Sequence, residues 1–123
     1  MRYNITPVSK PRQTRSDKWK QRPCVMRYRA FADEVRLNGV EVHENGSVVV
    51  FGMPMPKSWT KKKRAVFLGK AHQQKPDIDN LLKAVLDAIF DDDCAVWDIR
   101  AVKVWACDGF IEVIKGKPFK AEL

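Results

Sequence analysis

A cluster of acidic side chains in an otherwise basic chain is the feature that most constrains how this sequence can fold. Seven of its fifteen acidic residues lie between Asp77 and Asp98, where Lys83 is the only basic residue, yet the 123-residue chain carries a formal charge of +8. Crowded like charges raise the free energy of a folded protein unless something positive lies among them. Because carboxylate oxygens suit Mg²⁺ and Mn²⁺, this segment predicts a divalent metal site.

The length and composition indicate one folded domain, residues 1–123, with a basic loop at 9–22 and a charged tail at 115–123. Hydrophobic residues make up 45% of the chain, enough for a core, and no apolar run approaches the ~18 residues of a membrane helix. The N-terminus lacks the pattern of a signal peptide. The three cysteines are widely spaced and form no C-x-x-C pair, which favours neither a disulfide framework nor a zinc site. A reduced cytoplasmic protein is expected.

The positive charge is concentrated in two segments. Residues 1–22 hold seven Lys or Arg against the single acid Asp17, and residues 57–75 hold seven more and no acid. Such segments either form a solvated surface or bind a polyanion, of which nucleic acid is the commonest. The residues predicted to contact nucleic acid are Lys10, Arg12, Arg15, Lys61, Lys62, Lys63, Arg64 and Lys75.

Hydrophobic periodicity and turn residues predict an α/β fold, an α+β sandwich in which two to three helices pack on a small, mixed, mostly antiparallel sheet. The strongest helix should open near Asp79 or Asn80, with a continuous apolar face ending at Phe90. The run from Val48 to Phe51 indicates a central strand covered on both faces. The other expected elements are a strand at 2–8, helices at 23–37 and 58–68 (the latter capped by Ser58), a hairpin of 40–43 with 47–53 turning at Asn45–Gly46, and a returning strand pair at 99–106 and 110–114.

The acidic residues could make a metal site from both ends of the strongest helix. Asp77 and Asp79 are two residues apart, so in extended backbone their carboxylates point to the same side. Asp92 or Asp93 could supply the other half, and Lys83 could reach the same pocket to neutralise a phosphate in the transition state. The alternatives are a simple helix cap, an ordinary surface i,i+4 ion pair and a solvated loop. His72 is a weaker candidate for a general base.

Several well-known metal-binding and nucleotide-binding motifs are absent from this sequence. A calcium-binding EF-hand loop starting at Asp77 would need a glycine at Leu82 and a glutamate at Ala88, and neither is present. No phosphate-binding or dinucleotide-binding glycine pattern occurs.

The run KPDIDNLLKAVLDAIF from Lys75 to Phe90, followed by Asp92-Asp93, resembles the RusA family of Holliday-junction resolvases of bacteria and their phages. The family pattern is D-x-D-N, a lysine four residues after the second aspartate, and then a D-D pair. The outline of residues 2–37 and the segment from Pro54 to Trp59 are also similar to the family, so the resemblance covers the whole chain. The segment before the D-D pair is shorter than in some members, which leaves open which two of Asp91–Asp93 face the metal.

The resemblance implies a homodimeric, Mg²⁺- or Mn²⁺-dependent endonuclease from a phage or prophage, acting in the bacterial host cytoplasm in DNA recombination and repair. It would resolve four-way junctions by paired symmetric nicks, with no membrane partner and no small-molecule cofactor. By the resemblance, Asp77, Asp79 and Asp93 would bind metal, Asp92 would assist, and Lys83 would be the essential cation. The alternatives are a general nuclease for branched or flap DNA and a non-catalytic DNA-binding or phage regulatory protein.

Overall fold

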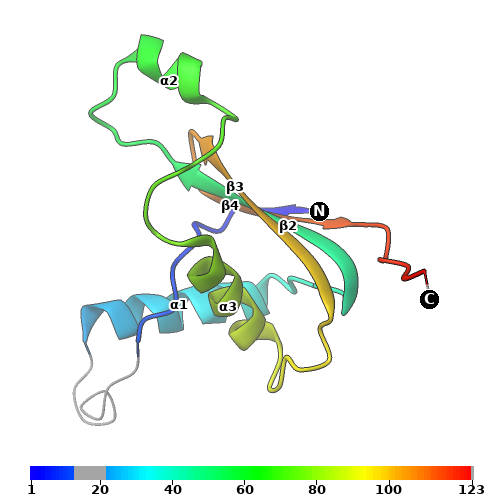
Figure 1. The fold of residues 1–123 in the computed structure, drawn as a ribbon. Helices are drawn as coiled ribbons and strands as arrows, with labels where there is room; N and C mark the ends of the chain where they lie inside the picture. The colour runs from blue at the N-terminus through cyan, green and yellow to red at the C-terminus, as the bar shows by residue number, and fades with distance from the viewer. Residues whose placement is uncertain (13–21, 123) are drawn as a thin grey trace.

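A four-stranded mixed sheet with helices on one face forms the framework of the protein (Figure 1). The computed structural model describes residues 1–12 and 22–122. Along the chain the elements are β1 (Arg2–Tyr3), α1 (Pro23–Leu37), β2 (Asn45–Pro54), α2 (Lys61–Phe67), α3 (Ile78–Ile89), β3 (Asp98–Ala106) and β4 (Phe110–Lys115). The predicted fold class is confirmed.

The strands lie in the order β1-β4-β2-β3. β2 is central, as predicted, and pairs in parallel with β3 and antiparallel with β4, while β1 pairs antiparallel with β4. The predicted pairing of 99–106 with 110–114 is wrong, because β2 lies between these two strands. The amide of Met55 donates to the carbonyl of Ala106 just beyond β2, at the end where the chain crosses from β3 to β4.

The predicted hairpin at Asn45–Gly46 is also wrong, because residues 40–43 form no strand and Asn45 begins β2. Gly46 adopts a φ of +77° at a register shift between β2 and β3, and a Cβ there would lie 3.0 Å from the carbonyl oxygen of Gly116. Gly46 is therefore needed for a bulge inside the strand and for a close backbone contact. Both require the positive φ that a turn would also have required.

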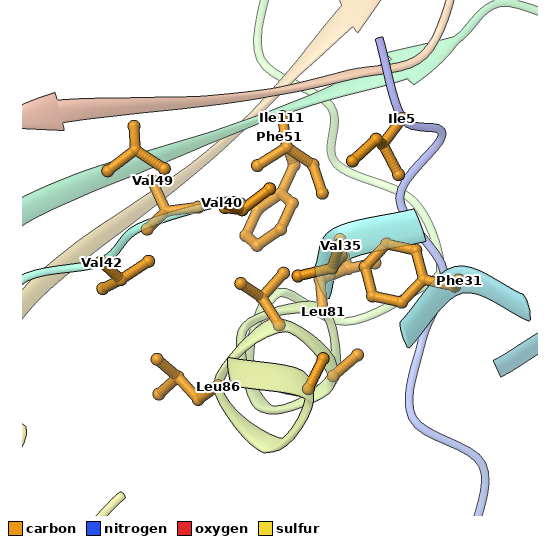
Figure 2. Packing of buried hydrophobic residues seen from close by; sticks show 14 of the residues in the cluster. Ile5, Phe31, Val35, Val40, Val42, Val49, Phe51, Leu81, Leu86 and Ile111 are labelled. Atoms are coloured by element: carbon orange, nitrogen blue, oxygen red, sulfur yellow. The ribbon is translucent and has the colours of Figure 1, made fainter. Parts of the chain in front are cut away.

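α1 and α3 cover the same face of the sheet and enclose the core (Figure 1). Figure 2 shows side chains from both helices and from β2 and β4 meeting in this layer. Val35, Phe51, Val85 and Ile111 have no exposed side-chain surface, and Leu81 is 1% exposed. Burial of this continuous apolar face fixes the orientation of α3 and therefore the direction in which its two ends point.

The opposite face of the sheet carries no helix (Figure 1). Val49 and Phe51 of β2 are fully buried, whereas Val48 and Val50, which alternate with them, stay half-buried. The expectation that β2 is covered on both faces is therefore wrong for this single chain.

The helix boundaries differ from prediction in two places. α2 begins after Thr60, whose hydroxyl accepts from the amide of Lys63 at 3.2 Å, because the chain turns at Ser58 before the helix starts. α3 begins at Ile78 with Asp77 in the cap position, earlier than expected, and the Asp77 side chain makes no capping bond.

The predicted strand at 2–8 is limited to β1, because the amide of Ile5 turns back onto the carbonyl of Tyr3 at 2.9 Å. α1 has the predicted bounds and ends at Asn38, followed by Gly39 with a φ of +63°. Within the described part of the chain, no helix combines the length and hydrophobicity needed to cross a bilayer.

Candidate active site

Asp77 and Asp79 lie at the N-terminal end of α3 with their side chains exposed. Asp77 is the extended residue before the helix, and Asp79 lies in its first turn. The unpaired amides of a helix N-terminus and its dipole favour negative charge there. The local backbone therefore accommodates two carboxylates in close sequence. The D-x-D prediction assumed extended backbone through Asp79, whereas the chain is already helical from Ile78.

Lys75 is the nearest cation to this pair on the loop itself. Its ammonium lies 2.9 Å from Oδ1 of Asp77, and both side chains are at least half exposed. The hydrogen bond and the charge of Asp77 raise the pKa of Lys75, with a smaller contribution from Asp79. Because water screens an exposed pair, Lys75 remains available to exchange Asp77 for a phosphate.

A second cation, Lys103, approaches the same loop from the sheet. Its ammonium donates to the carbonyl oxygen of Gln74 at 2.7 Å and to that of Pro76 at 2.8 Å. Lys103 is half-buried in β3, in register with the buried Phe51, so its stem lies on the helix-covered face. Sequence analysis missed this residue, because one lysine within an apolar strand carries no motif.

The remaining acids lie at the other end of α3. Asp91 and Asp92 are exposed and Asp93 is half-buried. Oδ1 of Asp92 accepts from the amide of Cys94 at 3.0 Å, and the carbonyl of Asp93 accepts from the amide of Val96 at 3.0 Å, so the run forms a local turn. The 12 residues of α3 span about 18 Å at a rise of about 1.5 Å per residue.

This separation decides which predicted ligands come together. Over residues 1–12 and 22–122, no group of three or more His, Cys, Asp or Glu side chains is placed to hold a metal ion. The predicted meeting of Asp77 and Asp79 with Asp93 is therefore not formed within one chain. The pair alone still suits Mg²⁺, which is usually bound through one or two carboxylates, water and a substrate phosphate.

Lys83 lies one turn into α3 but faces along the helix, away from its N-terminus. Its ammonium is 3.3 Å from Oδ1 of Asp87, while Lys10 approaches Oδ2 of the same carboxylate at 2.7 Å. Burial raises the pKa of Asp87, but hydrogen bonds and charges from the two lysines outweigh that effect and lower it. Burial by itself would lower the pKa of Lys10, but its hydrogen bond to Asp87, together with the charges of Asp87 and Tyr28, outweighs burial and raises that pKa.

These three side chains line an open cavity of about 630 Å³ with Pro11, Arg12 and Asn80. The amide of Lys10 also donates to the carbonyl of Asn80 at 3.3 Å. The start of the basic loop is thus fixed against α3 close to the acidic pair. Arg15, another residue predicted to contact nucleic acid, lies outside the described residues.

α2, which carries the basic run from Lys61 to Arg64, projects from the body of the protein (Figure 1). Lys61, Lys62 and Lys63 are all exposed, and the ammonium of Lys63 also lies 4.3 Å from the ring centroid of Trp59. The guanidinium of Arg64 donates to the carbonyl of Pro56 at 2.9 Å. Trp59 packs in turn on Trp105 of β3 at 4.8 Å between ring centroids, which ties α2 to the sheet.

His72 is 6% exposed, and its ring lies 4.3 Å from that of Trp105. Its Nδ1 has no hydrogen-bond partner among the described residues. Burial, and to a lesser degree the charge of Lys103, lowers the pKa of His72. His72 therefore stays neutral at pH 7, as a packed side chain.

The cysteines agree with the sequence-based expectation, since Cys24, Cys94 and Cys107 are all unpaired thiols.

Comparison with known proteins gives one clear result. A family model described as endodeoxyribonuclease RusA matches residues 4–114. No curated protein and no solved structure matches the chain significantly. The matched range contains the D-x-D-N motif, the basic segment 57–75, residues 4–22 of the first basic segment and all of β2, α3 and β3.

Proposed function

The chain belongs to the RusA endodeoxyribonuclease family, and from this premise we propose that it resolves four-way DNA junctions by paired, symmetric nicks. The observation that carries the proposal is the exposed pair Asp77 and Asp79 at the positive end of α3, with Lys75 paired to Asp77 and Lys103 bound to the carbonyl of Pro76. An open acidic pair flanked by cations can approach a phosphodiester that a uniformly acidic surface would repel.

We propose that Asp77 and Asp79 hold Mg²⁺ or Mn²⁺, and that an acid from Asp91–Asp93 completes the site only after a rearrangement or from a second subunit. A bound divalent ion would polarise the scissile phosphate and lower the pKa of a water molecule. The ammonium of Lys75 would release Asp77 and bind the phosphate instead. Lys83, the proposed essential cation, would have to leave Asp87 and turn toward the helix N-terminus.

The DNA-contact surface would join α2 to the start of the basic loop. Lys61 and Lys62 would contact phosphates, and Arg12 and Arg15 would do so from the loop. The ammonium of Lys10 is bound to Asp87, so Lys10 would anchor the loop on α3. A phosphate contact by Lys10 would come in addition to that role. Such contacts position DNA without reading its sequence, which suits an enzyme that recognises the shape of a junction.

A homodimer is part of the proposal, because a four-way junction is close to two-fold symmetric and its resolution needs two cuts. The uncovered sheet face supports this. Val50 faces the same way as its partner Val102 in β3, Val48 continues that row, and Ile114 of β4 is 44% exposed. Arg100 and Glu112, the register partners of Val48 and Val50, lie on the same face, so the surface combines apolar and charged side chains. A second copy packed on it would complete the burial of β2.

Cleavage of a synthetic four-way junction, with and without Mg²⁺ and against linear duplex competitor, tests the proposal. We expect two symmetric nicks that require the ion and persist in excess duplex. Equal cutting of flap or branched DNA would indicate a general branched-DNA nuclease. Junction binding with Mg²⁺ but no cutting would favour a non-catalytic binding protein, the candidate that the separation of Asp77 from Asp93 favours.

A further inference from the structure

The segment between α2 and α3 pairs with the free edge of β3 before the chain reaches Asp77. The amide of Gly69 donates to the carbonyl of Trp105, and the amide of Trp105 donates to the carbonyl of Lys70, each at 2.9 Å. The amide of His72 then donates to the carbonyl of Lys103 at 3.1 Å. Backbone pairing with β3 fixes the chain only as far as His72, five positions before the first acid of the pair.

Beyond His72, the side chain of Lys103 holds the chain in place of backbone pairing. Its ammonium bridges the carbonyls of Gln74 and Pro76, and Pro76 directly precedes Asp77. Hydrogen bonds from an ionised donor are shorter and stronger than neutral ones, and a half-buried ammonium loses less to solvent screening than an exposed one. One side chain of the sheet therefore holds two carbonyls of the loop that leads into α3.

The two lysines of this region contact different parts of the chain. The ammonium of Lys103 binds the carbonyl of the residue directly before Asp77, whereas Lys83, the lysine of the D-x-D-N motif, is engaged by Asp87 further along the helix. Lys103 is therefore the lysine that contacts the loop leading to the acidic pair.

We propose that Lys103 is a positioning residue for the acidic pair, holding the 74–77 loop so that Asp77 and Asp79 present their carboxylates together. This inference rests on the proposed role of that pair as the metal-holding group. Lys103 touches neither substrate nor metal and acts only through the loop carbonyls. A methionine in its place would fill the same space but leave both carbonyls without their donor.

The test compares Lys103→Met and Lys103→Arg with Lys115→Met, which removes an exposed lysine from the end of β4. The first measurement is amide hydrogen exchange of the metal-free proteins. Lys103→Met should speed exchange of the hydrogen-bonded amides that bracket the loop, those of His72 and Leu81, which donate to the carbonyls of Lys103 and Asp77. The β2 amides should stay protected, Lys103→Arg should restore slow exchange at His72 and Leu81, and Lys115→Met should match the wild type. If the Lys103→Met protein is globally unfolded, the same exchange measurement is made on Lys103→Arg and Lys103→Gln. Lys103→Gln should then exchange faster than Lys103→Arg at the same amides.

The second measurement is Mn²⁺ affinity by calorimetry. Loss of a group that orients metal ligands typically weakens metal binding about 10- to 100-fold, which is the loss expected for Lys103→Met. Junction affinity in EDTA should stay within about twofold, because Lys103 is not expected to touch a phosphate. Unchanged exchange at His72 and Leu81 with unchanged Mn²⁺ affinity, or equal losses in Lys115→Met, would overturn the inference. A wild-type protein that orders its loop through Lys103 but never cuts a junction would instead overturn the proposed function alone.

Discussion

The ammonium of Lys10 lies 2.7 Å from Oδ2 of Asp87, joining two residues 77 positions apart in the sequence. Each side chain is only 23% exposed, and the ammonium also lies 4.9 Å from the ring centroid of Tyr28 in α1. This contact connects the basic N-terminal loop, α1 and α3 at one point. It fixes the position of Lys10, at the start of the basic segment, on α3.

Replacing Lys10 by methionine should therefore destabilise the fold. Removing one partner of a largely buried, charged hydrogen bond costs about 1–3 kcal/mol. Oδ2 of Asp87 would lose its close donor, and only the more distant, exposed ammonium of Lys83 would remain on Oδ1. Urea unfolding measures the change. Lys83→Met is the matched control, because that ammonium touches the same carboxylate but is 59% exposed, and its loss should cost about 0.5 kcal/mol or less. Equal costs for the two variants would show that burial does not distinguish these pairs.

The same pair predicts a pH dependence of stability. The pKa of Asp87 is lowered in the folded protein, so the stability it contributes is present above its unfolded pKa of about 3.9 and is lost as pH falls through the lower folded value. Asp87→Asn keeps the shape but cannot titrate. The difference in unfolding free energy between wild type and Asp87→Asn should be constant near neutral pH and shrink in acid below about pH 4. A difference that grows in acid would contradict the lowered pKa.

The basic run of α2 should contribute to DNA binding through its exposed lysines. Removing one lysine that neutralises a phosphate of duplex DNA lowers the slope of log K against log salt by about 0.9, so Lys61→Gln with Lys62→Gln should lower it by about two. Junction binding at several salt concentrations measures this slope. Lys117→Gln with Lys120→Gln makes the same charge change in the tail and should leave the slope unchanged. If both double variants behave alike, α2 holds no specific place in the DNA surface.

The uncovered sheet face makes a prediction about assembly. Val102→Glu places a charge in the middle of that face, beside Val50, and should convert a dimer to a monomer because a buried unpaired charge is costly. Sedimentation equilibrium measures the mass. Val66→Glu introduces the same charge at an exposed position of α2 and should leave the mass of wild type unchanged. Dimerisation that survives Val102→Glu would place the interface elsewhere.

Elements stabilised by local contacts could be predicted from sequence. α1 has the predicted bounds because Pro23 at its start and Asn38–Gly39 at its end act on neighbouring residues. α3 could be identified because Leu81, Val85 and their neighbours repeat at helical spacing. The strand order could not be predicted, since β2 pairs with two strands that follow it by more than 40 residues, and Asn45–Gly46 gives the same signal for a bulge as for a hairpin.

The candidate site likewise has a part that local sequence predicts and a part that depends on the folding of the chain. The D-x-D spacing is local, and Asp77 and Asp79 do lie together at one end of α3. Proximity of Asp93 depends on the path of the chain after the helix, and the short Phe90–Asp91 connection leaves it at the opposite end. Lys103 could not be found from sequence, because its role follows from the packing of a loop on the edge of β3.

Metal-dependent cleavage by the wild type, Asp77→Asn and Asp79→Asn proteins on one synthetic four-way junction tests the central claim most directly, with binding measured in parallel. Asp108→Asn, which neutralises an exposed acid between β3 and β4, is the control. We predict that both acidic-pair variants bind the junction at least as well as the wild type and fail to nick it, while Asp108→Asn cuts normally. Normal cutting by Asp77→Asn and Asp79→Asn would contradict the proposed role of the pair.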